Sequence, residues 1–72
     1  MNYANLDRLK ILDYLERCGN EASVVDIIAY SGAEKLRVYS LITKMELNGE
    51  IKILEKTSFG APMSITLLYI YI

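Results

Sequence analysis

The stretch from Ser23 to Ile51 limits the possible folds of this chain more than any other. It contains a short apolar segment, a break at Gly32, and a longer amphipathic segment that stops at Asn48–Gly49. This pattern predicts a helix, a tight turn and a second helix that crosses the first. Gly32 is the turn residue best suited to a positive φ, because it has no Cβ. We therefore expect the rest of the chain to pack around this pair of helices.

The longer segment predicts a helix from about residue 33 to residue 47. Its apolar residues recur at helical spacing and predict one buried stripe, which consists of Val38, Leu41, Ile42 and Met45. Much of the remaining surface is polar and carries Lys35, Arg37, Tyr39, Ser40, Thr43 and Lys44. We expect this polar surface to face solvent or a ligand.

The N-terminal part of the chain predicts one supporting helix. Asn5 is the expected N-cap, because its side-chain oxygen can accept a hydrogen bond from a free backbone N–H. Apolar residues at helical spacing predict a buried face made of Leu6, Leu9, Leu12, Leu15 and Cys18, with Ile11 and Tyr14 flanking it. Gly19 is expected to end this helix in the left-handed conformation. The single cysteine, Cys18, cannot form an intrachain disulfide, and we expect it to be buried.

A second, short helix is predicted between residues 23 and 30, after a connection over residues 20–22. Ser23 suits its N-cap position, with Asp26 three residues later in the arrangement of a capping box. The residues that follow Ser23 are apolar nearly all round the helix. We therefore expect this helix to be largely enclosed by the rest of the domain.

The chain after residue 50 predicts a β-hairpin. Ile51 and Ile53 begin a strand, residues 56–62 have the composition of a turn, and residues 63–72 are rich in β-branched and aromatic residues. A hairpin that covers a small core should be apolar on one face only. This second strand is apolar on both faces, which predicts that one face meets another subunit.

We therefore expect a homodimer, with Leu67, Tyr69 and Tyr71 at the interface. Tyr14 on the first helix marks a rival dimer surface. The alternative is that the two tyrosines of the last strand are simply half-exposed in a monomer.

Several positions together resemble the winged helix-turn-helix family. Ile27–Ala29 followed by Ser31–Gly32 matches the run that closes the second helix of the family. The sequence Asn48–Ile51, preceded at helical spacing by Val38, Ile42 and Met45, matches the end of its recognition helix and the entry to its first strand. The resemblance implies one α+β domain over residues 1–72, with three helices followed by a two-stranded β-hairpin wing. The small size and the Ile- and Tyr-rich composition are also similar to DNA-binding proteins of archaeal viruses and plasmids.

The resemblance implies sequence-specific binding of double-stranded DNA by a transcriptional regulator. The helix over residues 33–47 would enter the major groove, and the wing over residues 55–62 would contact the backbone. The residues expected to contact DNA are Lys35, Arg37, Tyr39, Ser40, Lys44, Lys56 and Ser58. The alternative for the helix is an ordinary solvated face, and the alternative for the wing is a hairpin that does nothing but turn.

The charge balance favours a second functional class. The formal net charge is −1 and the pI is about 5.3, whereas nucleic-acid binders usually carry a basic excess. Leu36 lies at the start of the recognition helix, where DNA readers commonly carry a small polar residue, and Glu34 beside it would face phosphates. A winged-helix module that binds proteins rather than DNA is therefore the alternative function. A purely structural oligomerisation module is a weaker third possibility.

The sequence gives little support for catalysis. It contains no histidine and no glycine-rich phosphate loop, and the carboxylates of Asp7, Asp13, Glu16 and Glu21 are scattered over positions expected to be exposed. We therefore expect no enzyme activity, no metal site and no cofactor, and no small-molecule ligand can be identified. The longest apolar run is shorter than the roughly 20 residues of a membrane span. We accordingly expect a soluble cytoplasmic protein with no membrane partner.

Overall fold

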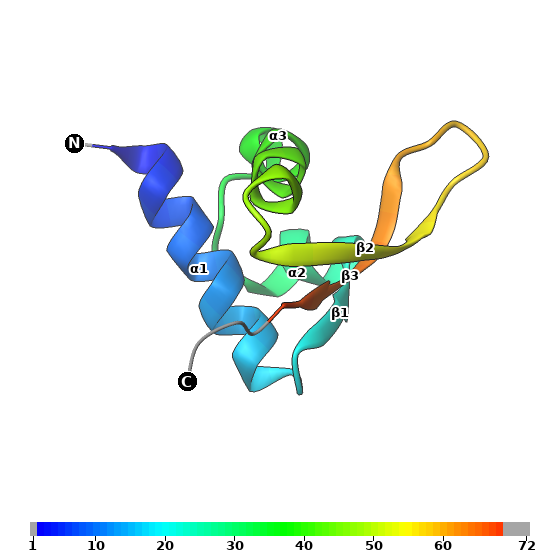
Figure 1. Cartoon of the computed structure of the whole chain (residues 1–72). Coiled ribbons are helices and arrows are strands. Elements are labelled where there is room, and N and C mark those ends of the chain that lie inside the picture. Colours follow the sequence, from blue (N-terminus) through cyan, green and yellow to red (C-terminus); the bar gives the residue numbers. More distant parts are fainter. Residues whose placement is uncertain (1, 69–72) are drawn as a thin grey trace.

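Three helices and a three-stranded antiparallel sheet make up the fold (Figure 1). The computed structural model describes residues 2–68 of the 72-residue chain. The elements in chain order are α1 (Tyr3–Arg17), β1 (Glu21–Ser23), α2 (Val24–Tyr30), α3 (Lys35–Leu47), β2 (Ile51–Lys56) and β3 (Pro62–Leu67). The predicted α+β class is therefore confirmed. No helix within residues 2–68 has both the length and the apolarity needed to cross a membrane.

Helix α1 begins earlier and buries a different face than the sequence predicts. Asn2, not Asn5, is the N-cap, because its Oδ1 accepts a hydrogen bond from the Asn5 backbone N–H at 3.0 Å. The buried row is Asp7, Ile11 and Leu15, spaced four residues apart. The predicted row was spaced three residues apart, and such a row drifts around a helix that has 3.6 residues per turn. Its members Leu6, Leu9 and Cys18 are exposed, so these three predictions were wrong.

Strand β1 was not predicted at all. It pairs with β3, which places Glu21 opposite Thr66 and Ser23 opposite Ser64, and the sheet order is β1-β3-β2. The backbone carbonyl of Asn20 extends this pairing by accepting from the Leu67 N–H at 2.7 Å. A three-residue strand with one apolar residue leaves no periodic signal in the sequence. The sheet therefore has three strands where the sequence indicated two.

Helix α2 is capped as predicted but is not enclosed. The Ser23 hydroxyl oxygen accepts from the Asp26 N–H at 3.1 Å, and Val24 and Ile27 are fully buried. Val25 and Tyr30, in contrast, are each 72% exposed. The prediction of an enclosed helix was wrong, because a seven-residue helix packs only one side against the sheet and α1. The other side forms an apolar surface of the domain.

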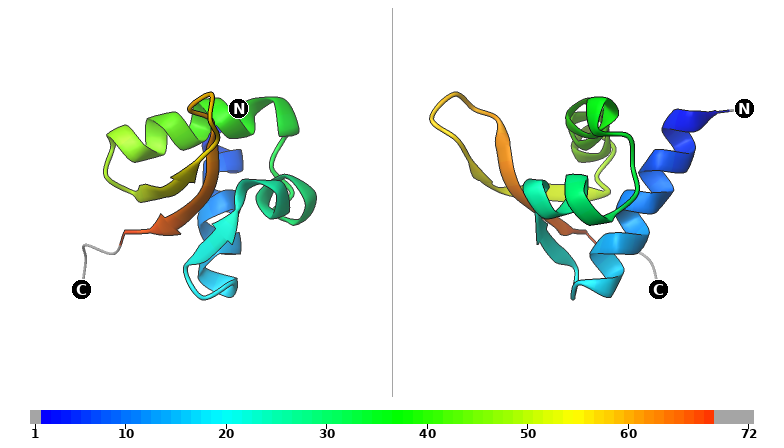
Figure 2. Two further views of the ribbon diagram at one scale, coloured as in Figure 1. Left: turned by 90° about the vertical axis from the view of Figure 1, so that its right-hand side faces the viewer. Right: turned by 180° about the vertical axis from the view of Figure 1, so that it is seen from behind.

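Helix α3 presents the predicted stripe to the core. Val38, Ile42 and Met45 are completely buried and Leu41 nearly so. The helix begins at Lys35, two residues later than predicted, because Glu34 is its N-cap and accepts from the Leu36 N–H at 3.2 Å. The preceding turn has Gly32 at φ +86°, as the sequence predicts. One side of α3 is therefore a wall of the core, and its opposite side faces outward (Figure 2).

The β2–β3 hairpin projects from the body of the domain (Figures 1 and 2). Ile51 pairs with Leu67 and Ile53 with Ile65, and the register is irregular from there to the Lys56–Pro62 pair. Irregularities of this kind bend a strand pair and increase its twist. The Thr57 side chain organises the tip, since its Oγ1 accepts from the backbone N–H groups of Phe59 and Ala61 at 3.2 and 3.1 Å.

Candidate nucleic-acid interface

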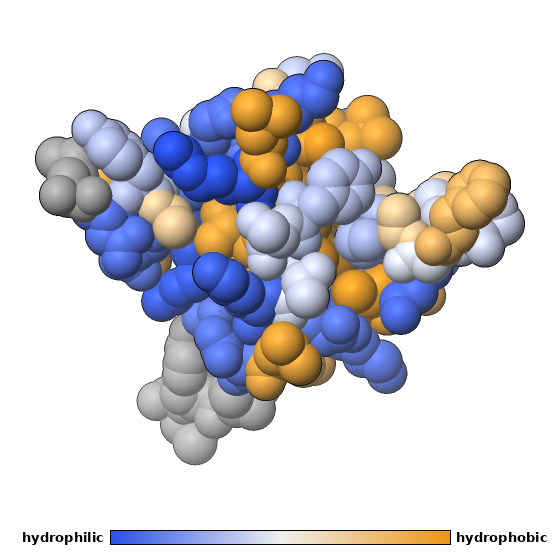
Figure 3. Space-filling view, turned by 90° about the horizontal axis from the view of Figure 1, so that it is seen from above, coloured by the Kyte–Doolittle hydropathy of each residue, from blue (hydrophilic) through white to orange (hydrophobic). Residues whose placement is uncertain are grey.

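The outward side of α3 and the hairpin tip lie on the same side of the molecule (Figures 1 and 2). Of the residues expected to contact DNA, Lys35, Tyr39, Ser40 and Lys44 are exposed on α3, and Lys56 and Ser58 are exposed on the hairpin. The fold thus leaves six of the seven exposed, on two elements that lie on one side of the molecule. Figure 3, which looks down on this surface, shows apolar and hydrophilic side chains interleaved over it.

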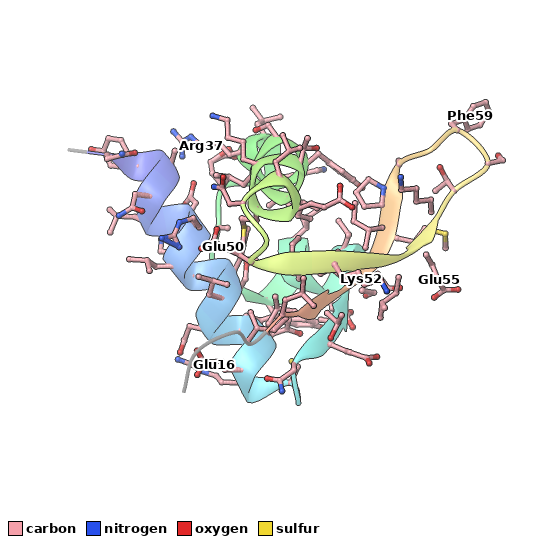
Figure 4. The ribbon with its side chains drawn as sticks, viewed as in Figure 1. Glu16, Arg37, Glu50, Lys52, Glu55 and Phe59 are labelled. Atoms are coloured by element: carbon pink, nitrogen blue, oxygen red, sulfur yellow. The ribbon has the colours of Figure 1, made fainter. Side chains whose placement is uncertain are left out.

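Arg37 is the seventh residue, and an ion pair within the chain holds it. Its Nη1 donates to Oδ2 of Asp7 at 2.8 Å, and its guanidinium carbon lies 5.8 Å from the centre of the Tyr3 ring. The side chain is 43% exposed, while that of Asp7 is 6% exposed. Figure 4 shows Arg37 on the flank of α3 that faces α1. The guanidinium therefore links α3 to α1 and is held on the α1 flank of the helix, away from its outermost line.

The Asp7 carboxylate is the one buried charged group in the described part of the chain. The hydrogen bond from Arg37 lowers its pKa below the ordinary value, against the opposing effect of burial. A hydrogen bond from the Glu34 backbone and the charges of Arg37 and Lys10 add to the lowering of the pKa. Asp7 is therefore ionised at neutral pH, and the pair anchors the N-terminal half of α3.

All three arginines of the chain are paired in this way. Arg8 donates to Glu50 at 2.9 Å in a partly buried pair, and Arg17 lies 2.6 Å from Asp13 in an exposed one. Together with Arg37 they complete the arginine content of the sequence. The cations that the proposed interface presents are accordingly lysines, namely Lys35, Lys44 and Lys56. Lysine contacts a phosphate as a point charge, whereas the arginine fork is the group that recognises guanine.

The hairpin divides its polar groups between two sides. Phe59 extends from the tip and is 97% exposed. Lys52 and Glu55 point away from α3 (Figure 4), and Glu55 accepts from the Ser64 hydroxyl at 3.1 Å. Lys52 therefore lies outside the candidate interface, although it belongs to the same strand as Lys56.

The structure describes two of the four residues expected at a dimer interface, Tyr14 and Leu67. Tyr14 and Leu67 are half-buried and pack against the core of their own chain. The Cys18 side chain beside Tyr14 raises the pKa of that phenol to about 12, and partial burial contributes. Tyr69 and Tyr71 lie outside the described residues.

Sequence reasoning missed several exposed apolar side chains. Leu47 on α3, which was not singled out from the sequence, is 80% exposed, and Leu36, which was, is 88% exposed. Both leucines lie outside the buried stripe formed by Val38, Ile42 and Met45, and this spacing could have predicted their exposure. Val25 and Tyr30 on α2 gave no such signal, because the predicted helix was apolar nearly all round.

Comparisons with known proteins found no relative. No protein-family model, no curated protein and no solved structure matches this chain. Within residues 2–68, no cluster of three His, Cys, Asp or Glu side chains could hold a metal ion.

The Asp7–Arg37 pair predicts a particular acid sensitivity. Because the pKa of Asp7 is lower in the folded chain, its stabilising contribution is complete above the unfolded-state pKa. It is lost as the pH falls through the folded-state pKa. Asp7→Asn should lower the free energy of unfolding at pH 7 by about 1–3 kcal/mol, since the negative charge that strengthens the hydrogen bond from Arg37 is lost. Thermal melts between pH 2 and pH 7 measure this, at about 4–8 °C per kcal/mol for a domain of this size.

Asp13→Asn is the matched control, because its carboxylate is exposed and paired with Arg17 on the same helix. Exposed pairs contribute about 0–1 kcal/mol. Two results would contradict the role assigned to the buried pair. One is an equal loss of stability in the two variants, and the other is the same fall in melting temperature at acid pH in Asp7→Asn as in the wild type.

Proposed function

We propose that this chain binds double-stranded DNA as a transcriptional regulator of the winged-helix type. The observation that carries the proposal is the placement of α3 and the hairpin tip on one side, with Lys35, Lys44 and Lys56 exposed there. A helix beside a projecting hairpin fits a duplex, because the helix matches the width of the major groove and the hairpin can follow the adjacent backbone.

Each side chain has a definite role in this proposal. Lys35 and Lys44 contact phosphates on either side of the groove, since nine residues of helix place them about two and a half turns apart, on opposite flanks. Tyr39 and Ser40 lie closer to the groove floor. Lys56 and Ser58 contact the backbone through the wing over residues 55–62. Arg37 acts as a positioning residue, because its guanidinium holds the helix on α1.

Affinity in this arrangement depends on few cations. Each phosphate that a lysine neutralises releases about 0.9 counterions from the duplex. Three lysines per chain therefore give a weak dependence on salt. A homodimer doubles that number and pairs two copies of α3 on a palindromic site. We therefore include dimerisation in the proposal, and the apolar residues left exposed on such a small domain support it.

A protein-binding module is the second candidate function. The specific observation in its favour is the number of large apolar side chains on the same side, with Leu36, Leu47 and Phe59 each at least 80% exposed. Exposed apolar groups that gather on one face commonly mark a protein contact.

Charge reversal at the two flanking lysines separates the candidates. A Lys35→Glu, Lys44→Glu variant should bind a mixed-sequence 25-base-pair duplex at least tenfold more weakly at about 50 mM salt, because four charges change sign across a dimer. Fluorescence anisotropy of the labelled duplex measures the affinity. Lys52→Glu is the control, since this lysine points away from α3 (Figure 4). Unchanged binding by the double variant, or no binding by the wild type, would favour the protein-binding module.

Dimerisation has its own test. Sedimentation at several protein concentrations should show a dimer that dissociates on dilution. A Tyr69→Ser, Tyr71→Ser variant should shift that equilibrium towards monomer if the C-terminal segment forms the interface, because two apolar rings are removed. A wild-type monomer at every concentration would contradict the proposed dimer. If the variant dimerises as strongly as the wild type, the interface lies on the Tyr14 side instead.

A further inference from the structure

The outermost line of α3 carries no charged side chain. It consists of Leu36, Ser40, Thr43 and Leu47, which we call the α3 crest. All four are exposed, and their spacing of four, three and four residues places them on one side of the helix. The buried stripe of Val38, Ile42 and Met45 lies opposite. If α3 enters a groove, the crest is the part that meets the base edges.

The two hydroxyl groups of the crest are already committed as donors. The Ser40 hydroxyl donates to the Arg37 carbonyl and the Thr43 hydroxyl donates to the Tyr39 carbonyl, both at 3.1 Å. Outward they present only oxygen lone pairs and, at Thr43, a methyl group. Arg37, the nearest strong donor, is held by Asp7 at 2.8 Å. The crest therefore offers methyl groups and acceptors, but no free donor.

The base pairs differ in how they suit such a surface. In the major groove, both kinds of base pair present two acceptors and one amino donor: N7 and O6 of guanine with the cytosine amino group, and N7 of adenine and O4 of thymine with the adenine amino group. The A·T pair differs by the thymine methyl, which is an apolar group and therefore the feature that suits an exposed leucine. Leu36 can bury against the methyl, and a hydroxyl oxygen can accept from the amino group. A polar base edge against the Leu36 side chain would lose water without gaining a partner.

We infer that the α3 crest recognises thymine methyl groups in the major groove, with Leu36 as the main contact and Thr43 as the second. The inference rests on the proposed function and names the duplex that α3 selects. Lys35 and Lys44 flank the crest and complement the phosphates that border a groove. Selectivity comes from apolar contact, while these lysines supply affinity for any duplex.

Removing the methyl groups from the DNA tests this directly. The probes are two 25-base-pair A·T-rich duplexes of identical sequence, one with thymine and one with uracil, which lacks the methyl group. The wild-type protein should bind the thymine duplex about fourfold more tightly for each methyl that is buried. A second pair of duplexes, G·C-rich with cytosine or 5-methylcytosine, adds a methyl group at the same ring position without changing the base pair.

Variants assign the effect to the crest. Leu36→Ser should lower the thymine-to-uracil affinity ratio about fourfold, because the main methyl contact is removed, and it should remain folded, because Leu36 is 88% exposed. Phe59→Ser, at the hairpin tip, is the control and should keep the wild-type ratio.

The outcomes separate this inference from the proposed function. A wild-type ratio above about three that falls at least about threefold in Leu36→Ser supports the inference. Equal wild-type affinity for the two duplexes overturns it and leaves DNA binding intact. A ratio that is unchanged in Leu36→Ser also overturns it, since the methyl groups are then contacted elsewhere. Absence of binding to all four duplexes at low salt overturns both proposals.

Discussion

The ion pair between Asp7 and Arg37 is the contact on which the arrangement of this domain depends. A carboxylate removed from water is tolerated only when a partner compensates the lost hydration, and here Arg37 donates to it at 2.8 Å. The pair joins the N-terminal halves of α1 and α3, and Asp7 is the one buried charged side chain among residues 2–68. With the stripe of Val38, Ile42 and Met45 held inward, the opposite side of α3 must face solvent.

This constraint also determines what the interface can do. All three arginines form ion pairs that involve α1, so the outward side of α3 presents lysines beside apolar and hydroxyl side chains. Such a surface can attract a polyanion but has no guanidinium fork with which to read guanine. The same exposed leucines suit a protein partner. The balance between these two functions therefore depends on whether phosphates or apolar groups meet the crest.

The sequence predicted those features that have a strong local signal. The α3 stripe, the Ser23 cap and the positive φ of Gly32 each follow from periodicity or from a residue with a special backbone role. Features that depend on distant partners were missed or misplaced. Strand β1 exists because β3 pairs with it, and the buried face of α1 is the one that meets α3. The Asp7–Arg37 pair spans thirty residues, and no pattern in the chain marks it. Six of the seven expected contact residues are exposed, because the exposure of polar residues away from a buried stripe can be read from the local sequence pattern.

Amide chemical-shift mapping tests the central claim most directly, namely that the outward side of α3 is a duplex-binding surface. The 15N-labelled protein would be titrated at low salt with a mixed-sequence duplex. The account predicts shifts at Lys35, Ser40 and Lys44 and at the hairpin tip around Ser58, with the α2 residues Val25 and Tyr30 unaffected. Shifts confined to α2, or no shifts at any duplex concentration, would contradict it.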